Sequence, residues 1–230
     1  ELPPGRDFDY INAEVIETRL GVKDGRLVLP HGATYHVLVL PEQATMRPAP
    51  LRKLRDLVAA GATVLGPPPS RSPSREGYPG CDDEVRALAA EVWGEGAAGA
   101  PAGEHRFGAG RVIWGQALEP VLAAAGVPPD FASDAPLRQT HRVAGDTDIY
   151  FLANPQAHSV STIATFRSRG RAPELWWPDT GRTVRPAVYD ETGGRTRVPV
   201  RLGPHGSVFV LFRNAPADPD RIVSATRNGV

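Results

Sequence analysis

HRVAGDTDIYFLAN, at residues 141–154, marks the point where the pattern of this sequence changes. Before it, short continuous apolar runs alternate with segments of helical periodicity, as in α/β domains. After it, and up to residue 213, almost every apolar run is short, strand-like and bounded by turn residues. We therefore predict an α/β domain at residues 1–132 and an all-β domain at residues 133–213.

The α/β domain is predicted from a strand, helix, strand pattern. HVLVL at residues 36–40 is a continuous apolar run of the kind found in strands that are buried on both faces. Apolar residues then recur every three or four positions between residues 51 and 58, which predicts a helix, and residues 62–65 form a second buried strand. In such a unit the two strands are parallel and the connection is right-handed.

A hairpin is expected before this unit. Residues 13–20 alternate in a way that is compatible with a strand, and Lys23-Asp24-Gly25 is a turn signal. Residues 26–29 are then predicted to pair back as the second arm.

Three more elements are expected after the unit. A helix begins at Asp82 or Asp83, a third buried strand covers residues 111–114, and a short helix covers residues 118–125. Such an array is typical of a doubly wound sheet, here expected to lack its first elements because the chain starts late in the pattern.

The all-β domain is predicted to be a β-sandwich. Short strands separated by turn residues are typical of that architecture. Seven are predicted, at residues 137–143, 147–153, 160–166, 173–176, 183–189, 196–200 and 207–212. The polar segment at residues 214–230 is predicted to be a poorly ordered tail.

Composition excludes several classes of partner and site. The sequence has 26 Lys and Arg and 26 Asp and Glu residues, so there is no electrostatic case for nucleic acid or an anionic membrane as a partner. No apolar run approaches the roughly 20 residues that span a bilayer. A single cysteine, Cys81, excludes an internal disulfide, and the histidines lack metal-ligand spacing, so we predict no metal site in this chain.

Two motifs that could carry chemistry have the wrong context. Cys81 follows a proline-rich loop instead of a buried strand, so it lacks the strand-to-helix turn that exposes a nucleophile and is predicted to be an ordinary half-buried thiol. Gly108 and Gly110 precede a strand, whereas phosphate-binding glycines follow a strand and open a helix. We predict a turn there.

Five residues are candidates for contact with a substrate. Asp9 and Asn12 lie in DFDYIN, where polar residues alternate with aromatic ones, a pattern that fits a sugar-contacting segment or an amphipathic edge segment equally well. His141 and Arg142 could bind a carboxylate or a sugar hydroxyl, although an interdomain salt bridge is the simpler interpretation. Trp177 follows Trp176, and alternation places the two indoles on opposite faces of a strand, so one of them could stack on a sugar.

Glycoside hydrolysis would require two carboxylates that face each other across a sugar. The spacing of the acidic residues does not single out such a pair. The candidates are Asp7, Asp9, Glu14, Glu17, Asp146, Asp148 and Glu174.

Five stretches together resemble one known family. They are DFDYINAEVIETRL, DGRLVLPHGATYHVLVLPEQATM, LRKLRDLVAAGATVLGPPPSRSPS, HRVAGDTDIYFLAN and PELWWPDTG. In this order they resemble the C-terminal region of the α-L-rhamnosidases of glycoside hydrolase family 106. The resemblance covers residues 7–213, nearly the whole chain.

The resemblance implies a long bacterial enzyme with an N-terminal (β/α)₈ catalytic barrel, calcium dependence, and two glutamates that invert the anomeric centre. No stretch here matches the barrel, so no catalytic residue and no cofactor is predicted in this chain. By the same resemblance, residues 1–132 look like a glutamine amidotransferase or flavodoxin-like fold without its nucleophile. The implied partners are the barrel and a rhamnose-containing glycan, and the implied location, by analogy, is outside the cytoplasm.

The resemblance therefore predicts a non-catalytic C-terminal part of a glycoside hydrolase that buttresses an absent catalytic barrel. The chain alone should be inactive. Two other classes of function remain open from the sequence, a free-standing carbohydrate-binding module and an oligomerisation module.

Overall fold

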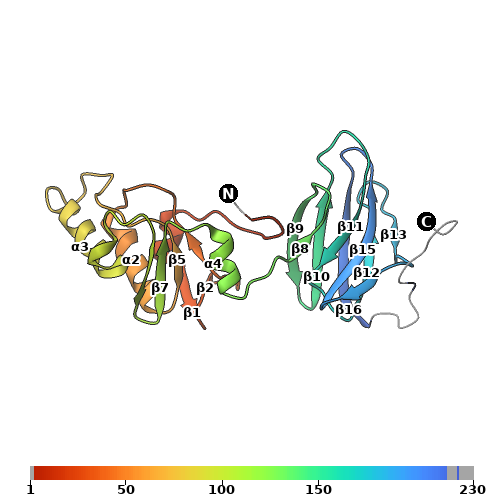
Figure 1. Ribbon diagram of the computed structural model, residues 1–230, viewed down its shortest axis with the longest axis horizontal. Coiled ribbons are helices and arrows are strands. Elements are labelled where there is room, and N and C mark those ends of the chain that lie inside the picture. The colour runs from red at the N-terminus through yellow and green to blue at the C-terminus, as the bar shows by residue number, and fades with distance from the viewer. Residues whose placement is uncertain (1–2, 217–221, 223–230) are drawn as a thin grey trace. The chain divides into compact units, whose positions relative to one another are not determined.

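The computed structural model describes residues 3–216 and residue 222 (Figure 1). Two compact units make up this part of the chain. Residues 9–127 form one, which we call the α/β unit. The other, the β unit, contains the described residues up to Phe8 and from Pro128 onward. A region with a parallel sheet is thus followed by antiparallel sheets, as the sequence predicts.

The boundaries of the units differ from the predicted division at residue 132. The segment before Asp9 belongs to the β unit, because the Gly5 carbonyl accepts hydrogen bonds from the N–H groups of Asp130 and Phe131, at 2.7 and 3.3 Å. Gly5 has φ of +73°, and a Cβ there would lie 1.9 Å from the Phe131 carbonyl oxygen, so only glycine fits. The α/β unit is therefore inserted between two segments of the β unit.

The sheet of the α/β unit has the order β4-β5-β7-β6. Strands β4 (Leu38–Val39), β5 (Thr63–Leu65) and β7 (Gly110–Trp114) are parallel, as predicted for the first two from the sequence. Strand β6 (Gly103–Phe107) pairs antiparallel with β7 and was not predicted. The prediction missed this strand, whose residues alternate in exposure, because the glycines before it suggested a loop. The 3₁₀ turn η1 (Glu95–Ala97) precedes it.

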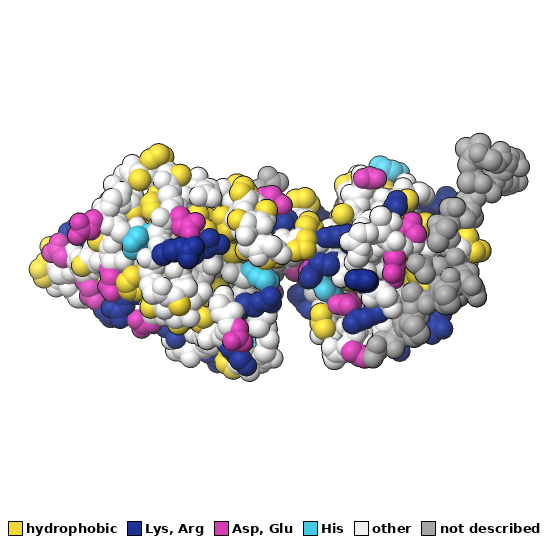
Figure 2. Space-filling model, turned by 60° about the horizontal axis from the view of Figure 1, so that its bottom comes forward, with side chains coloured by type: hydrophobic (Ala, Val, Ile, Leu, Met, Phe, Trp, Pro, Cys, Tyr) yellow, Lys and Arg dark blue, Asp and Glu magenta, His cyan; other side chains and the backbone are white. Residues whose placement is uncertain are grey.

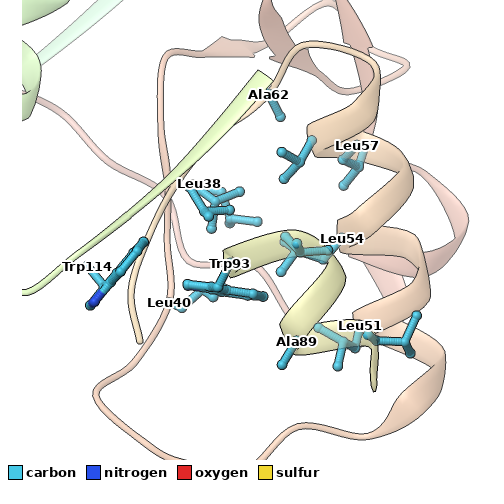
Figure 3. Packing of buried hydrophobic residues seen from close by; sticks show 14 of the residues in the cluster. Leu38, Leu40, Leu51, Leu54, Leu57, Ala62, Ala89, Trp93 and Trp114 are labelled. Atoms are coloured by element: carbon cyan, nitrogen blue, oxygen red, sulfur yellow. The ribbon is translucent and has the colours of Figure 1, made fainter. Parts of the chain in front are cut away.

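Helices cover both faces of this sheet. Helices α2 (Pro48–Ala59) and α3 (Cys81–Trp93) share a buried cluster with Val64 and Val112, and Figure 3 shows their side chains converging in that core. Leu65 and Ile113, the next residue in each strand, contact α4 (Leu118–Ala124) instead. Side chains alternate across a strand, so α4 lies on the opposite face from α2 and α3. None of the helices in the described residues is both long and apolar enough to cross a membrane.

The prediction of a strand at residues 13–20 is wrong. Residues 13–18 form helix α1 (Ala13–Thr18), because the Asn12 side chain caps it, accepting a hydrogen bond from the Val15 N–H at 2.9 Å. The predicted turn is correct, since Asp24 and Gly25 have φ of 52° and 72°. It joins β1 (Gly21–Lys23) to β2 (Arg26–Val28), which also pairs with β3 (Thr34–Tyr35).

Two antiparallel sheets form the β unit, with the orders β13-β12-β16-β10-β9 and β14-β15-β11-β8. They face each other across one core that includes Tyr150, Phe166 and Phe212, all fully buried. The strands are β8 (Phe131–Ala132), β9 (Arg138–Ala144), β10 (Thr147–Ala153), β11 (Val160–Phe166), β12 (Arg171–Trp176), β13 (Thr183–Val184), β14 (Asp190–Thr192), β15 (Arg195–Leu202) and β16 (Ser207–Pro216).

Two predicted features of the β unit require correction. The strand predicted at residues 183–189 is limited to β13 at residues 183–184, and β14 begins after it, at Asp190, in the other sheet. The predicted tail at residues 214–230 begins inside β16, and all of it after residue 216 except residue 222 lies outside the described residues. On the face shown in Figure 2, charged side chains of both signs lie on each unit.

Replacing Gly110 by alanine is expected to destabilise the α/β unit by about 1–3 kcal/mol, because the added methyl group overpacks a tight crossing. A Cβ at Gly110 would lie 2.3 Å from the carbonyl oxygens of both Ala62 and Val58, and neither backbone can yield easily. Gly96→Ala is the matched control, since a Cβ there meets nothing within 4 Å. Urea unfolding of the two variants measures the difference, and equal stabilities would contradict the account.

Candidate functional site

The five candidate residues belong to different units. Asp9 and Asn12 lie in the α/β unit, whereas His141, Arg142 and Trp177 lie in the β unit. Asp9 accepts a hydrogen bond from the Tyr35 hydroxyl at 2.7 Å, and Asn12 caps helix α1. The side chains of Asp9 and Asn12 are thus engaged in contacts within the α/β unit.

His141 lies at the centre of a polar cluster in the β unit. Its Nδ1 atom is 3.3 Å from an Asp130 carboxylate oxygen, and its Nε2 atom is 2.9 Å from Asp148. The imidazole stacks on Tyr150, its cross-strand partner on β10, with ring centroids 4.1 Å apart and planes 2° apart. Arg167 pairs with Asp130, and Arg171 pairs with Asp148 at 2.9 Å. We call these six residues the histidine cluster.

The cluster holds His141 as a cation. Burial alone would lower the pKa of His141, but its hydrogen bonds with Asp130 and Asp148 and their negative charges raise it from 6.5 to about 9. Burial also opposes ionisation of Asp130, yet its hydrogen bonds with His141 and Arg167 leave the pKa of that carboxyl below its usual range. Burial and the neighbouring aspartates raise the pKa of Tyr150. A histidine fixed between two carboxylates is suited to stabilising the fold and poorly suited to exchanging protons with a substrate near neutral pH.

Arg142 is tied to the segment that precedes the α/β unit. Its Nη1 atom is 2.7 Å from Asp7 Oδ2, and the same oxygen accepts a hydrogen bond from the His141 N–H at 2.9 Å. The sequence suggested an ion pair with acids of the other domain. Three acidic partners of this pair, Asp130 and Asp148 for His141 and Asp7 for Arg142, belong to the β unit.

A second polar cluster surrounds Glu174 on β12. Its side chain is 12% exposed and pairs with Arg185 at 3.2 Å and Arg213 at 3.5 Å. Trp176 donates a hydrogen bond from Nε1 to the same carboxylate at 3.2 Å, and the Arg213 guanidinium lies 5.0 Å from the centre of its ring. Trp177 instead packs against the core between the sheets. The two tryptophans therefore lie on opposite faces of the strand, and do not form a joint sugar-stacking surface.

Most of the acidic candidates are engaged in structural contacts. Such engagement leaves them poorly placed to act as a catalytic pair. The pairs are Asp7 with Arg142, Asp9 with Tyr35, Glu17 with Arg47, Asp148 with His141 and Arg171, and Glu174 with Arg185 and Arg213.

The described residues provide no site for a metal. Within residues 3–216 and residue 222, no group of three or more His, Cys, Asp or Glu side chains could hold an ion. Cys81 is buried at the start of α3, directly after the loop, and Gly108 lies in the turn that precedes β7.

Sequence reasoning missed most of the histidine cluster. Asp130, Tyr150, Arg167 and Arg171 carry no motif, and each is ordinary at its position in the sequence. The alternation of β10 does place Asp148 and Tyr150 on one face, which is the only available signal.

The two units have a fold that is known from glycoside hydrolases. A GH42 β-galactosidase from G. stearothermophilus aligns with 78% of this chain, at a TM-score of 0.51 and 10% sequence identity, over 32% of its own length. At that identity the likeness concerns the fold alone.

Sequence then identifies the family. Residues 1–191 match glycoside hydrolase family 106, described as alpha-L-rhamnosidase, and the chain belongs to this family. The solved rhamnosidase from Novosphingobium sp. PP1Y is 37% identical, with a TM-score of 0.82 over 96% of this chain and 21% of that protein. A protein of Formosa agariphila named "Putative beta-glucuronidase" is 36% identical over 222 residues, 96% of this chain and 18% of its own length. The chain thus spans about a fifth of these relatives.

Proposed function

We propose that this chain is a non-catalytic accessory part of a longer α-L-rhamnosidase-like glycoside hydrolase, and that it buttresses the catalytic barrel of that enzyme. One observation carries the proposal. Relatives of the same family align with almost the whole chain but with only 21% and 18% of their own lengths. The catalytic glutamates and any calcium would belong to the remainder, and the partner would be a rhamnose-containing glycan bound by the whole enzyme.

The chemistry of the described residues supports an accessory role. Several of the carboxylates that could have formed a catalytic pair, those of Asp7, Asp9, Asp148 and Glu174, are held by arginines, by histidine or by a tyrosine hydroxyl. Contact with the substrate through Asp9, Asn12, His141, Arg142 or Trp177 is an alternative proposal that the structure supports less well than the accessory role. In each case, the structure supplies a local partner for the side chain or its backbone.

The proposal is tested by comparing the 230-residue chain with the longer protein on an aryl α-L-rhamnoside. We expect hydrolysis by the longer protein and none by the chain. Hydrolysis by the chain alone would show that a catalytic pair lies within it, and Asp9, Glu14 and Glu174 would then be the first carboxylates to replace.

A further inference from the structure

The outer face of the five-stranded sheet in the β unit is apolar. On β10, Tyr150 and Leu152 point into the core between the sheets, so the alternate residues Ile149 and Phe151 point outward. By the same alternation, Phe209 and Leu211 point outward from β16. None of these four belongs to the core cluster between the two sheets.

Strand register brings these residues together across three strands. Phe209 pairs with Phe151 on one side and with Trp176 of β12 on the other, and Leu211 likewise joins Ile149 to Glu174. The rings of Phe151 and Phe209 lie 4.8 Å apart. We call this surface the outer strip. It consists of Ile149, Phe151, Trp176 and Phe209, which are partly exposed, and Leu211, which is only 6% exposed.

The other sheet provides an internal comparison. On its outer face, Arg201 pairs with Ser161 and Arg197 pairs with Thr165, so that surface is polar and suited to water. Ile163 is an apolar side chain there, 43% exposed, and it pairs with the exposed Pro199. Because an antiparallel sheet that faces solvent normally carries polar residues outward, the outer strip indicates a face that is covered by something.

The composition of the outer strip and its edge is that of a protein interface. Interfaces combine aromatic residues with arginine, and lack lysine. Here Arg142, Arg185 and Arg213, which are 60%, 74% and 48% exposed, come from strands and turns of the same sheet. A sugar is a poorer fit as the occupant, since Arg213 already lies over the Trp176 ring.

We propose that the outer strip is the surface by which this chain packs against the remainder of the longer enzyme. The matching surface would be apolar, with acidic residues opposite the arginines. The inference rests on the proposed function for the existence of that remainder, which in the relatives accounts for about four-fifths of the length.

The test compares Ile149→Asp with Ile163→Asp, which place the same charge on the outer faces of the two sheets. In the longer enzyme, Ile149→Asp should lower the unfolding temperature by about 4 °C or more beyond Ile163→Asp, whereas in the 230-residue chain the two shifts should be similar. Equal shifts in the longer enzyme would overturn the proposal. So would a chain that forms dimers which Ile149→Asp dissociates, because the occupant would then be a second copy.

A measurement on the unmodified proteins keeps the proposal testable if Ile149→Asp does not fold. Hydroxyl-radical labelling of Phe151 and Phe209 should be several-fold weaker in the longer enzyme than in the chain, with Ile163 labelled equally in both. Equal labelling of the phenylalanines would contradict the proposal. Activity of the longer enzyme on the rhamnoside is recorded separately, so that loss of the proposed function is distinguished from failure of this interface.

Discussion

Replacing His141 by glutamine is expected to remove roughly 3 kcal/mol of stability from the β unit at pH 6, and to abolish most of its pH dependence above that point. The imidazole has an ordinary pKa of 6.5 and a folded-state pKa of about 9. Below the first value both states carry the proton and the stabilisation is complete. Between the two values only the folded protein holds it, so stability falls as pH rises, and the contribution is lost above about pH 9.

Calorimetry across this pH range checks the prediction, with His158→Gln as the control because that side chain is exposed. The wild-type protein and the control should lose stability between the two pKa values, and His141→Gln should show a much flatter profile. Identical slopes in all three proteins would contradict a charged His141 in the cluster. Asp130 acts in the opposite direction, since its lowered pKa stabilises the fold above its ordinary value of 3.8 and the effect is lost in acid.

Replacing Phe166 by alanine is expected to destabilise the β unit by about 3–5 kcal/mol, the largest effect predicted for a single residue. Phe166 is fully buried between the sheets, and its ring lies 4.9 Å from Tyr150 and 5.3 Å from Phe212, centre to centre. Thr165→Ala, one residue earlier and facing outward, is the matched control, with an expected effect under about 1 kcal/mol.

The same experiment tests the division into units. Since the α/β unit has its own core, Phe166→Ala should lower the calorimetric transition of the β unit and leave that of the α/β unit almost unchanged. A loss of similar size in both transitions would show that the two cores unfold together.

The local pattern of apolar and polar residues was sufficient to predict a helix or strand where one physical cause determines the structure. The apolar spacing between residues 51 and 58 predicts a helix because it places every large apolar side chain on one face, and α2 buries those residues. The strands at residues 147–153 and 160–166 were predicted with their observed bounds, because alternation and turn residues agree there.

The sequence pattern gave wrong predictions where a single side chain or a segment far along the chain determines the secondary structure. Ala13–Thr18 alternates like a strand, but the Asn12 cap and neighbouring helix formers favour a helix. The segment predicted as one strand at residues 183–189 holds only the two-residue β13, and the next strand, β14, starts at Asp190 and joins the other sheet, which depends on partners far along the chain.

The candidate site shows the same limit more strongly. His141 and Arg142 were recognisable as a basic pair, but Asp7 lies about 135 residues away along the chain and reaches both of them. Nothing in local spacing encodes that contact. It forms because Gly5, two residues before Asp7, accepts hydrogen bonds from the backbone N–H groups of Asp130 and Phe131 at the start of β8. These bonds hold the segment that carries Asp7 in place.

The most direct test of the buttressing role is to delete this region from the longer enzyme and to measure hydrolysis of the aryl α-L-rhamnoside together with the unfolding temperature. The account predicts that the remaining protein unfolds at a lower temperature and loses most of its activity. If the remainder keeps both its unfolding temperature and its activity, the region does not support the catalytic domain, and the proposed function is wrong.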